Sequence, residues 1–362
     1  MLHLVPGQTG GSELYARRLI PALLEADSSL ELVLLASSRT IPSLEAEPWS
    51  GSVELVGLPF DARSRVRRVL AEQTLLSREV ASRNVELLHN LFTTAPAILR
   101  VPQVTTIHDV IYKRFPETHG GVLSKGLAGL VWVSARRSQR VIAPSEAAKT
   151  DIVRFLGVPL ERVDVTYEGP GLPQDRTLTE VDVRRELELG DRPIVLTVSA
   201  KRPHKNLERL FQAFAAVDGD AVLVVPGYET SFEAELRGKA GDSVRFTGWL
   251  DDAVLDGLYR AATCLVFPSL AEGFGLPVLD ALARGTPVAT SNATSLPEVA
   301  GDAALYFEPE DMEAIAASIA RLLADESLRA RLSEAGPLQA AKFSWARTAE
   351  ASLESYRRAL AD

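Results

Sequence analysis

Several residue types and patterns are scarce in this sequence, and each absence excludes a class of protein. Cysteine occurs once, as Cys264 within an apolar run, so an intrachain disulfide is excluded and a buried thiol is favoured. No uninterrupted apolar run approaches the ~18 residues of a membrane span, and no basic segment followed by a long apolar one opens the chain. No basic stripe interleaved with aromatic residues is present, which argues against a nucleic-acid partner. These absences predict a cytoplasmic protein without a membrane span.

The composition is that of a globular protein with two domains. The chain has 362 residues, of which 46% are apolar and 24% charged, and one hydrophobic core rarely serves a chain of this length. The net charge is −9, yet residues 1–173 are almost neutral, with 19 basic and 18 acidic side chains. Because nearly all the acidity lies in the second half, we expect two domains with different surfaces.

Short β-rich runs alternate with helical patterns along both halves of the chain. Such alternation predicts parallel strands covered by helices on both faces. The Gly- and Pro-rich segment 169–182 interrupts the alternation and is typical of a linker. We therefore predict an α/β protein of two doubly wound, Rossmann-like domains facing a central cleft. The domains span residues 1–172 and 173–344, and a last helix at about 345–362 packs back on the first domain.

Three local elements of the first half are expected from the pattern alone. A short strand is predicted at "LHLV", residues 2–5, and helices are predicted at about 61–82 and 94–99. Ligands of doubly wound sheets bind in crevices at the carboxyl ends of the strands. Candidate site residues are therefore sought directly after strands.

The segment 269–292 carries the most specific signal. It places Gly273 and Gly275 after an apolar strand and before a helix that starts at Pro277. Glycines let the backbone approach a ligand, and the free N–H groups of a helix start favour phosphate. Glu272 and Asp280 flank this turn, where they can accept hydrogen bonds from hydroxyl groups. Phosphate between hydroxyl-bearing groups describes a nucleotide sugar; the alternative is that both acids only cap the helix.

This segment resembles the signature of the family 4 retaining glycosyltransferases (glycosyl transferases group 1), which have the GT-B architecture. Residues 272–290, "EGFGLPVLDALARGTPVAT", match it nearly throughout. The resemblance covers the whole chain, with further matching segments at 10–19, 105–109, 140–152, 205–214, 244–252 and 295–311. It implies that Glu272 contacts the donor sugar and that the second carboxylate, Asp280, holds the ribose. Asp280 departs from the family's usual glutamate, which is longer by one methylene.

The resemblance also implies a cationic group for the diphosphate. Lys205 opens a helix after a strand, where its ammonium can neutralise a leaving diphosphate; the alternative is a solvated lysine at a helix start. The family often has an arginine where this chain has Ala200, so Arg202, or else Lys201, is expected to supply a second positive charge. The remaining predicted donor-binding residues are Gly273, Phe274, Gly275, Leu276 and Glu298, and helix capping explains Glu298 equally well.

The first half contributes the remaining candidates. His108 ends a strand and matches the family's histidine near the donor sugar and acceptor, so it is predicted to be catalytic with Lys205 and Glu272. Asp109 is expected to orient the same loop. Gly10 and Gly11 precede a helix, at another turn that can receive an anion. The resemblance implies that this loop lies beside the reacting centre and borders the acceptor.

The expected reaction transfers a glycosyl group from a nucleotide diphosphate sugar to an acceptor hydroxyl with retention. No metal or other cofactor is expected, because the D-x-D pattern at 218–220 lies at the wrong end of a strand. An NAD-dependent oxidoreductase and an inactive nucleotide-sugar-binding partner protein are the alternatives, and the loop at 6–13 lacks the G-x-G-x-x-G spacing of the former. An epimerase or a phosphorylase of the same fold matches the signature less well.

Substrate identity rests on weaker features. The segment 108–117, "HDVIYKRFPE", resembles mannosyl- and rhamnosyl-transferring members, which favours GDP-mannose over UDP-, ADP- or dTDP-sugars. The acceptor is expected to be a sugar, a glycan or a lipid-linked sugar in glycan, polysaccharide or glycolipid synthesis. Residues 61–83 hold six arginines against three acids and form either a helix that rests on the inner face of an anionic membrane or a solvated helix.

Overall fold

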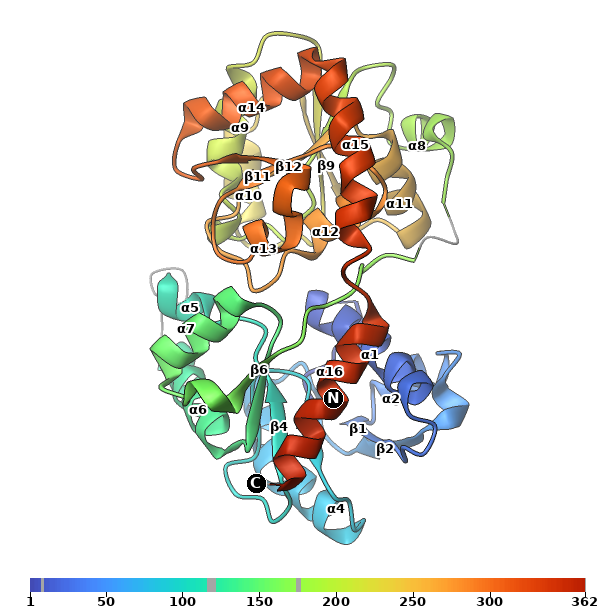
Figure 1. Ribbon diagram of the computed structural model, residues 1–362, viewed down its shortest axis with the longest axis vertical. Coiled ribbons are helices and arrows are strands. Elements are labelled where there is room, and N and C mark those ends of the chain that lie inside the picture. Colours follow the sequence, from blue (N-terminus) through green and yellow to red (C-terminus); the bar gives the residue numbers. More distant parts are fainter. Residues whose placement is uncertain (8–9, 116–121, 174–176, 362) are drawn as a thin grey trace. The chain divides into compact units, whose positions relative to one another are not determined.

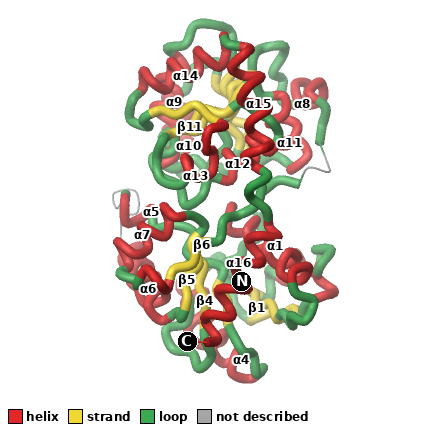
Figure 2. The backbone as a smooth tube through the Cα atoms, in the orientation of Figure 1, coloured by secondary structure: helices red, strands yellow, loops and turns green. Residues whose placement is uncertain are grey.

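The computed structural model describes residues 1–7, 10–115, 122–173 and 177–361 (Figure 1). The chain divides into two units, each with its own core: unit 1 comprises Met1–Gly169 and Ser344–Asp362, and unit 2 comprises Pro170–Phe343. In both units parallel strands are covered by helices (Figure 2). The prediction of an α/β protein built from two Rossmann-like halves is confirmed.

Unit 2 is built on one six-stranded, wholly parallel sheet. Its strand order is β12-β11-β10-β7-β8-β9, so the chain starts in the middle, runs to one edge and then returns to fill the other side. The direction of winding therefore reverses between β7 and β10, which is where such sheets bind ligands. The strands are β7 (Ile194–Leu196), β8 (Val222–Pro226), β9 (Val244–Gly248), β10 (Cys264–Phe267), β11 (Val288–Ser291) and β12 (Ala304–Phe307).

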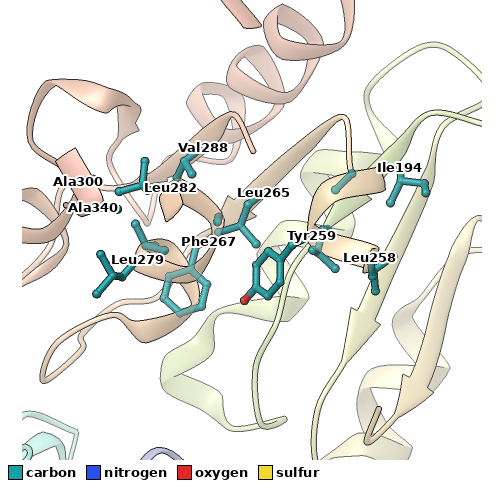
Figure 3. Packing of buried hydrophobic residues seen from close by; sticks show 14 of the residues in the cluster. Ile194, Leu258, Tyr259, Leu265, Phe267, Leu279, Leu282, Val288, Ala300 and Ala340 are labelled. Carbon is teal, nitrogen blue, oxygen red and sulfur yellow. The ribbon is translucent and has the colours of Figure 1, made fainter. Parts of the chain in front are cut away.

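Alternate residues of the central strands bury into separate cores on the two faces of this sheet. Ile194 and Leu265 pack into one core, whose side chains Figure 3 shows, whereas Val195 and Cys264 pack into the other. Burial raises the pKa of the Cys264 thiol to about 12, so it remains protonated. The covering helices are α8 (Glu180–Glu186), α9 (Leu207–Ala215), α10 (Glu233–Lys239), α11 (Asp252–Ala261), α12 (Leu276–Ala283), α13 (Leu296–Ala300), α14 (Met312–Ala324) and α15 (Glu326–Ala340).

Unit 1 has two parallel sheets, β1-β2 and β3-β4-β5-β6. The strands are β1 (Val33–Ser37), β2 (Glu54–Leu58), β3 (Leu88–Asn90), β4 (Gln103–Thr106), β5 (Arg140–Ala143) and β6 (Val163–Val165). The helices are α1 (Gly11–Ala26), α2 (Ile41–Glu45), α3 (Arg65–Ala71), α4 (Ser77–Ser82), α5 (Ile111–Arg114), α6 (Val122–Arg137), α7 (Glu146–Leu156) and α16 (Trp345–Ala361). The last helix belongs to this unit, because Ala349 and Leu353 pack into the same core as α1.

The predicted strand at residues 2–5 is wrong. Leu2 and Leu4 are buried, but the backbone forms a turn in which Leu4 N donates to Met1 O at 3.2 Å. The terminal ammonium of Met1 donates to Leu35 O in β1 at 2.8 Å. A turn has no ladder of N–H and C=O groups to share with neighbouring strands, so this segment buries apolar side chains without forming a strand.

The predicted helix at 94–99 is also wrong, and its backbone donors show why. Ala95 N donates to Ser134 Oγ and Ala97 N donates to Gln73 Oε1, both at 2.8 Å. Pro96, between them, has no N–H. Two of its backbone N–H groups bind distant side chains and Pro96 has none, so these groups do not form helical hydrogen bonds and the segment is an irregular connection.

The predicted helix at 61–82 starts later than expected. Ser64 caps α3, its hydroxyl accepting from Arg67 N at 3.4 Å. A single π-helical stretch, Glu72–Leu76, joins α3 to α4. Among the described residues no helix has the length and apolar character needed to cross a membrane.

Candidate active site

The central feature of unit 2 is an ion pair between residues that follow its two innermost strands. Lys205 comes after β7 and Glu272 comes after β10, and these strands are neighbours in the sheet. Lys205 Nζ donates to Glu272 Oε1 at 2.6 Å, and the two side chains are 15% and 10% exposed. Two of the three residues predicted to be catalytic therefore meet at the point where the winding reverses.

Asn206, which sequence reasoning missed, ties the loops around this pair together. Its backbone is left-handed, with φ of 59°, and its side-chain amide donates to Pro268 O at 3.1 Å and to Pro309 O at 2.6 Å. Leu270 N donates to His204 O at 2.8 Å. The loops after β7, β10 and β12 are thus cross-linked, which holds Lys205 in place. An asparagine directly before an apolar helix was the signal available in the sequence, since asparagine adopts the left-handed backbone more readily than most residues.

The backbone around Glu272 is held by the segment that precedes α13. Glu272 N donates to Thr294 Oγ1 at 2.9 Å, and Ser295 Oγ donates to Phe274 O at 2.6 Å. Glu298 lies in the first turn of α13, so this anchoring brings it to the same edge of the sheet. Ser295 opens the matching segment 295–311, but nothing in the sequence indicated that Thr294 and Ser295 hold the turn around Glu272.

In the turn that leads into α12, one position requires glycine. Gly275 precedes the helix with φ of 120°, and a Cβ atom there would lie 2.8 Å from Leu296 Cδ2. Gly273 lies in the same turn. Phe274 is 4% exposed and its ring packs edge-on against Phe343, with centroids 5.8 Å apart. The Phe274 side chain therefore anchors the turn in the core, which leaves only its backbone to face a ligand.

Leu276 is the first residue of α12 and is partly buried against the same core. Pro277 follows it and suits a helix start, because its missing N–H would have no intrahelical acceptor. Val278 N and Leu279 N of this turn donate to Gly275 O at 3.0 and 3.1 Å. The segment 273–276 remains a candidate for binding an anion at this helix start.

Asp280 is buried and its carboxylate accepts hydrogen bonds from the protein backbone, which its predicted role as the ribose partner does not require. It is 5% exposed, and its Oδ1 accepts from Gly171 N at 2.9 Å and from Leu172 N at 3.0 Å. These donors belong to the segment that opens unit 2. In this structure the shorter aspartate binds protein backbone, a partner that the sequence did not indicate.

A buried arginine, Arg284, completes this arrangement. It donates to Asp256 Oδ1 at 2.5 Å and to Asp280 Oδ1 at 3.4 Å, and its side chain is 0% exposed. It also donates to Leu172 O at 3.3 Å and to Pro173 O at 3.2 Å. The Asp280 carboxylate and the Arg284 guanidinium thus join the end of α12 to residues 171–173, and Asp256 of α11 holds the guanidinium.

The structure separates the two candidates for a second cation. Lys201 is 0% exposed and its Nζ donates to Gly227 O at 2.7 Å. Burial lowers the pKa of Lys201 to about 8. Arg202 is exposed, and its carbonyl accepts from Lys205 N at 3.0 Å. Lys201 is therefore committed to the protein interior, and Arg202 remains the candidate next to Lys205, while Ala200 offers no charge.

His108 of unit 1 follows β4 and has polar partners on both ring nitrogens. Its Nε2 lies 3.0 Å from Leu91 O, and its Nδ1 lies 3.5 Å from Glu168 Oε1. Burial by itself lowers the pKa of His108, but the hydrogen bond and charge of Glu168, the Leu91 carbonyl and Asp109 together raise it above its ordinary value. Sequence reasoning missed Glu168; its place directly after a strand was the available signal.

The other candidates of unit 1 lie at loop positions. Asp109 Oδ1 accepts from Ile111 N at 3.0 Å, which stabilises the turn after His108. Gly10 caps α1 with φ of 60°, and Gly11 is the first residue of that helix. The 108–117 segment extends beyond residue 115, so its last residues lie outside the described part of the chain. Each unit thus holds its own group of candidate residues.

The described residues include no cluster of three or more His, Cys, Asp or Glu side chains that could hold a metal ion. The D-x-D pattern at 218–220 lies between α9 and the start of β8, at the amino edge of the sheet. Lys205 and Glu272 lie at the carboxyl edge. The pattern is therefore part of a turn remote from the candidate site.

Comparisons with known proteins agree with this geometry. Residues 180–339 match the model of the glycosyl transferases group 1, and residues 9–169 match that of glycosyltransferase family 4. The O-antigen chain mannosyltransferase B of Escherichia coli is 30% identical over 266 residues, which cover 70% of each chain. The mannosyltransferase WbdA of E. coli is 31% identical over 240 residues, which cover 62% of this chain but only 29% of that longer protein.

A solved structure shares the fold. The Anabaena protein HepE, crystallised with UDP and glucose, superimposes with a TM-score of 0.76 at 20% identity, covering 97% of each chain. Two units of parallel strands covered by helices, together with this superposition, give the chain the GT-B fold. The chain belongs to the family 4 glycosyltransferases, the glycosyl transferases group 1, and is a retaining glycosyltransferase that uses a nucleotide-sugar donor. The oxidoreductase alternative is not supported.

Proposed function

We propose that this glycosyltransferase moves mannose from GDP-mannose to the hydroxyl group of a sugar, glycan or lipid-linked acceptor in glycan or polysaccharide synthesis. The observation that carries the donor half of this proposal is the Lys205–Glu272 pair, 2.6 Å apart beside the start of α12. A cation, a carboxylate and free helix N–H groups are the groups that a sugar diphosphate needs. The donor sugar and base rest on the mannosyltransferase relatives and on the 108–117 segment.

The roles follow from the chemistry of each side chain. Lys205 and Arg202 neutralise the diphosphate, and the backbone of Gly273, Phe274, Gly275 and Leu276 donates to its oxygens. Glu272 accepts hydrogen bonds from the donor sugar. Asp280 and Glu298 serve the nucleoside, and the backbone N–H groups of residues 171–172 hold the Asp280 carboxylate in place.

In the transfer step the bond between the anomeric carbon and the leaving phosphate oxygen breaks, and a bond from that carbon to the acceptor oxygen forms on the same face. The acceptor's proton passes to the leaving phosphate oxygen, so charge and atoms balance without a protein nucleophile. Lys205 and the helix start stabilise the charge that develops on the diphosphate. His108 is catalytic on the acceptor side, where Asp109, Gly10 and Gly11 shape the loops.

A metal ion is unnecessary in this proposal. The diphosphate charge that a divalent ion would offset is met by Lys205, by Arg202 and by the partial charges at the start of α12. The proposal therefore includes donor binding and turnover in the presence of a chelator.

We further propose that the enzyme contacts an anionic membrane surface through α3. Val66 and Leu70 are each 59% exposed and lie four residues apart, on one face of this helix. Arg65 and Arg67 are exposed beside them. Apolar side chains flanked by arginines on a surface helix favour the interface of an anionic bilayer, where a lipid-linked acceptor would lie.

Calorimetric titration of the purified protein with GDP, UDP, ADP, dTDP and NAD, each in EDTA and then in magnesium, tests the donor. Tight binding of GDP in EDTA, followed by transfer of mannose from GDP-mannose, is the expected result. Binding of another nucleoside diphosphate would correct the base. Binding of NAD alone, or of none of the five, would contradict the proposed function.

A further inference from the structure

Both ring nitrogens of His108 face oxygen atoms that can only accept hydrogen bonds or carry negative charge. The carbonyl oxygen of Leu91 lies 3.0 Å from Nε2, and the carboxylate of Glu168 lies 3.5 Å from Nδ1. A neutral imidazole carries one N–H and therefore leaves one nitrogen lone pair directed at an oxygen. The imidazolium carries two N–H groups and satisfies both neighbours.

This arrangement is built into rigid parts of unit 1. Leu91 follows β3, His108 follows β4 and Glu168 follows β6, so three strand ends fix the three groups. The Glu168 side chain is 4% exposed and the His108 side chain is 15% exposed. From α1, the ring of Tyr15 packs edge-on against the imidazole, with centroids 4.8 Å apart. Limited access of water strengthens the attraction between the carboxylate and the ring.

The charges around His108 favour its protonated form. Glu168 and Asp109 are the carboxylates that act on it. Burial, together with the nearby Glu168, raises the pKa of Tyr15 well above its ordinary value, so its phenol stays neutral. Burial also lowers the pKa of His89, on the neighbouring strand, to about 3, so His89 is neutral at pH 7.

His89 shows what a buried histidine without a carboxylate partner looks like in the same unit. Its Nδ1 lies 2.6 Å from Tyr356 Oη and its Nε2 lies 2.8 Å from Thr106 Oγ1. Hydroxyl groups both donate and accept, so a neutral ring satisfies these partners. Glu168 is the carboxylate whose hydrogen bond and charge act on His108, and the terminal ammonium and His108 itself act on His89 in the opposite direction.

We propose that Glu168 is a positioning residue that keeps His108 as a fixed imidazolium, and that His108 acts in glycosyl transfer through this charge and not by accepting the acceptor's proton. The inference rests on the proposed function, because it concerns His108 in that reaction. A ring whose two protons are committed cannot take up another. Its positive charge can still stabilise negative charge that develops in the transition state, and the acceptor's proton leaves on a phosphate oxygen.

The test combines a spectroscopic titration with a rate profile, both on the full-length protein. Histidine is labelled with ¹⁵N, the His108 signal is assigned with the H108Q variant, and its pKa is followed by NMR. We expect His108 to titrate above its ordinary value of about 6.5, and Glu168→Gln to lower that pKa by about one unit or more. The alkaline limb of kcat/KM, which reports the free enzyme, should move to lower pH by the same amount, with little loss of rate at low pH.

Two further variants keep the result interpretable. Glu168→Asp retains the charge and should restore most of the titration shift, even if the glutamine variant folds poorly. Glu72→Gln is the matched control, since Glu72 is also buried and pairs with a histidine, His3, at 3.1 Å. It should move the signal of His3 and leave that of His108 in place.

A His108 that is neutral at pH 7, or a pKa and rate profile that Glu168→Gln leaves unchanged, would overturn the inference. An activity that falls equally at every pH would also overturn it, because that is the effect of a structural residue. Calorimetry with nucleoside diphosphates tests the proposed function independently of the His108 titration. If the His108 titration behaves as expected but no nucleoside diphosphate binds in calorimetry, the pair is structural and the proposed reaction is wrong.

Discussion

Lys205 and Glu272, which are 67 residues apart in the chain, form a 2.6 Å ion pair over the two central strands of unit 2. The ammonium also lies 5.5 Å from the centre of the Phe267 ring. The cation proposed to bind the diphosphate is thus paired with the carboxylate proposed to contact the sugar. Donor binding must loosen or share this contact, which leads to different predictions for the two partners.

Replacing Lys205 by methionine should lower kcat by about 10²- to 10³-fold, because a preorganised positive charge on the leaving group is lost. Affinity for nucleoside diphosphate should fall as well. Lys239→Met is the control, since Lys239 also pairs with glutamates but lies on the exposed face of α10. Steady-state kinetics and calorimetry would check this, and wild-type turnover by K205M would contradict the role of Lys205.

Glu272→Gln should separate sugar recognition from diphosphate binding. The change removes a negative charge beside Lys205, so nucleoside diphosphate should bind as tightly as before or more tightly. Turnover of the nucleotide sugar should nevertheless fall, because the sugar loses its carboxylate partner. Calorimetry with the diphosphate and kinetics with the intact donor measure the two effects. Equal losses of both would mean that Glu272 holds the loop and not the sugar.

Asp280→Ala should destabilise unit 2 by about 2–4 kcal/mol, because Gly171 N and Leu172 N lose their acceptor and Arg284 keeps only one of its two carboxylates. Denaturant unfolding monitored by circular dichroism is the measurement. Glu310→Ala, at an exposed carboxylate of the same unit, is the control and should change stability by less than about 0.5 kcal/mol. A D280A protein as stable as the wild type would show that the contact with residues 171–172 contributes little.

Acid should destabilise the protein partly through His89. Its folded-state pKa of about 3 lies below the ordinary value, so the unfolded chain binds the proton more readily as the pH falls from about 6.5 to 3. The free energy of unfolding should therefore decrease over that window, with a slope of at most ~1.4 kcal/mol per pH unit for one proton. Comparison of wild type with His89→Gln isolates the contribution of His89. If the free energy of unfolding of the two proteins changed in parallel with pH, this prediction would be contradicted.

His108 should affect the pH dependence of the free energy of unfolding with the opposite sign. Because its folded-state pKa is raised, its stabilising effect is fully present below pH ~6.5 and is lost as the pH rises through the folded-state value. The Glu168→Gln variant should therefore approach the wild type in stability at alkaline pH and differ most near neutral and mildly acidic pH. Urea unfolding at a series of pH values gives this difference directly.

Membrane contact through α3 can be tested with vesicles. Replacing both Arg65 and Arg67 by Glu should abolish co-sedimentation with anionic vesicles, and replacing Val66 and Leu70 by Ser should weaken it. Arg63 is a less informative target, because it already pairs with Asp61 at 3.1 Å. Vesicles of zwitterionic lipid are the control. Unchanged sedimentation of R65E/R67E would identify α3 as a solvated helix.

Much of the architecture could be predicted because strands and helices leave regular patterns. The alternation along the second half predicted parallel strands covered by helices, and the glycines and proline at 273–277 marked the start of α12. The predicted helix at 94–99 was wrong because side chains from distant parts of the sequence accept hydrogen bonds from its backbone. The donors of Ala95 and Ala97 bind Ser134 and Gln73, and no local pattern reveals such partners.

The sequence by itself determined that the chain forms two α/β halves and that Lys205 and Glu272 follow strands of one sheet. Those features depend on local spacing, and the carboxyl ends of parallel strands meet at one edge. Only the tertiary structure decided that Lys201 is buried, that Asp280 holds residues 171–172 and that Glu168 faces His108. Each depends on which way a side chain points and on what lies opposite it, and those are set by packing between segments far apart in the chain.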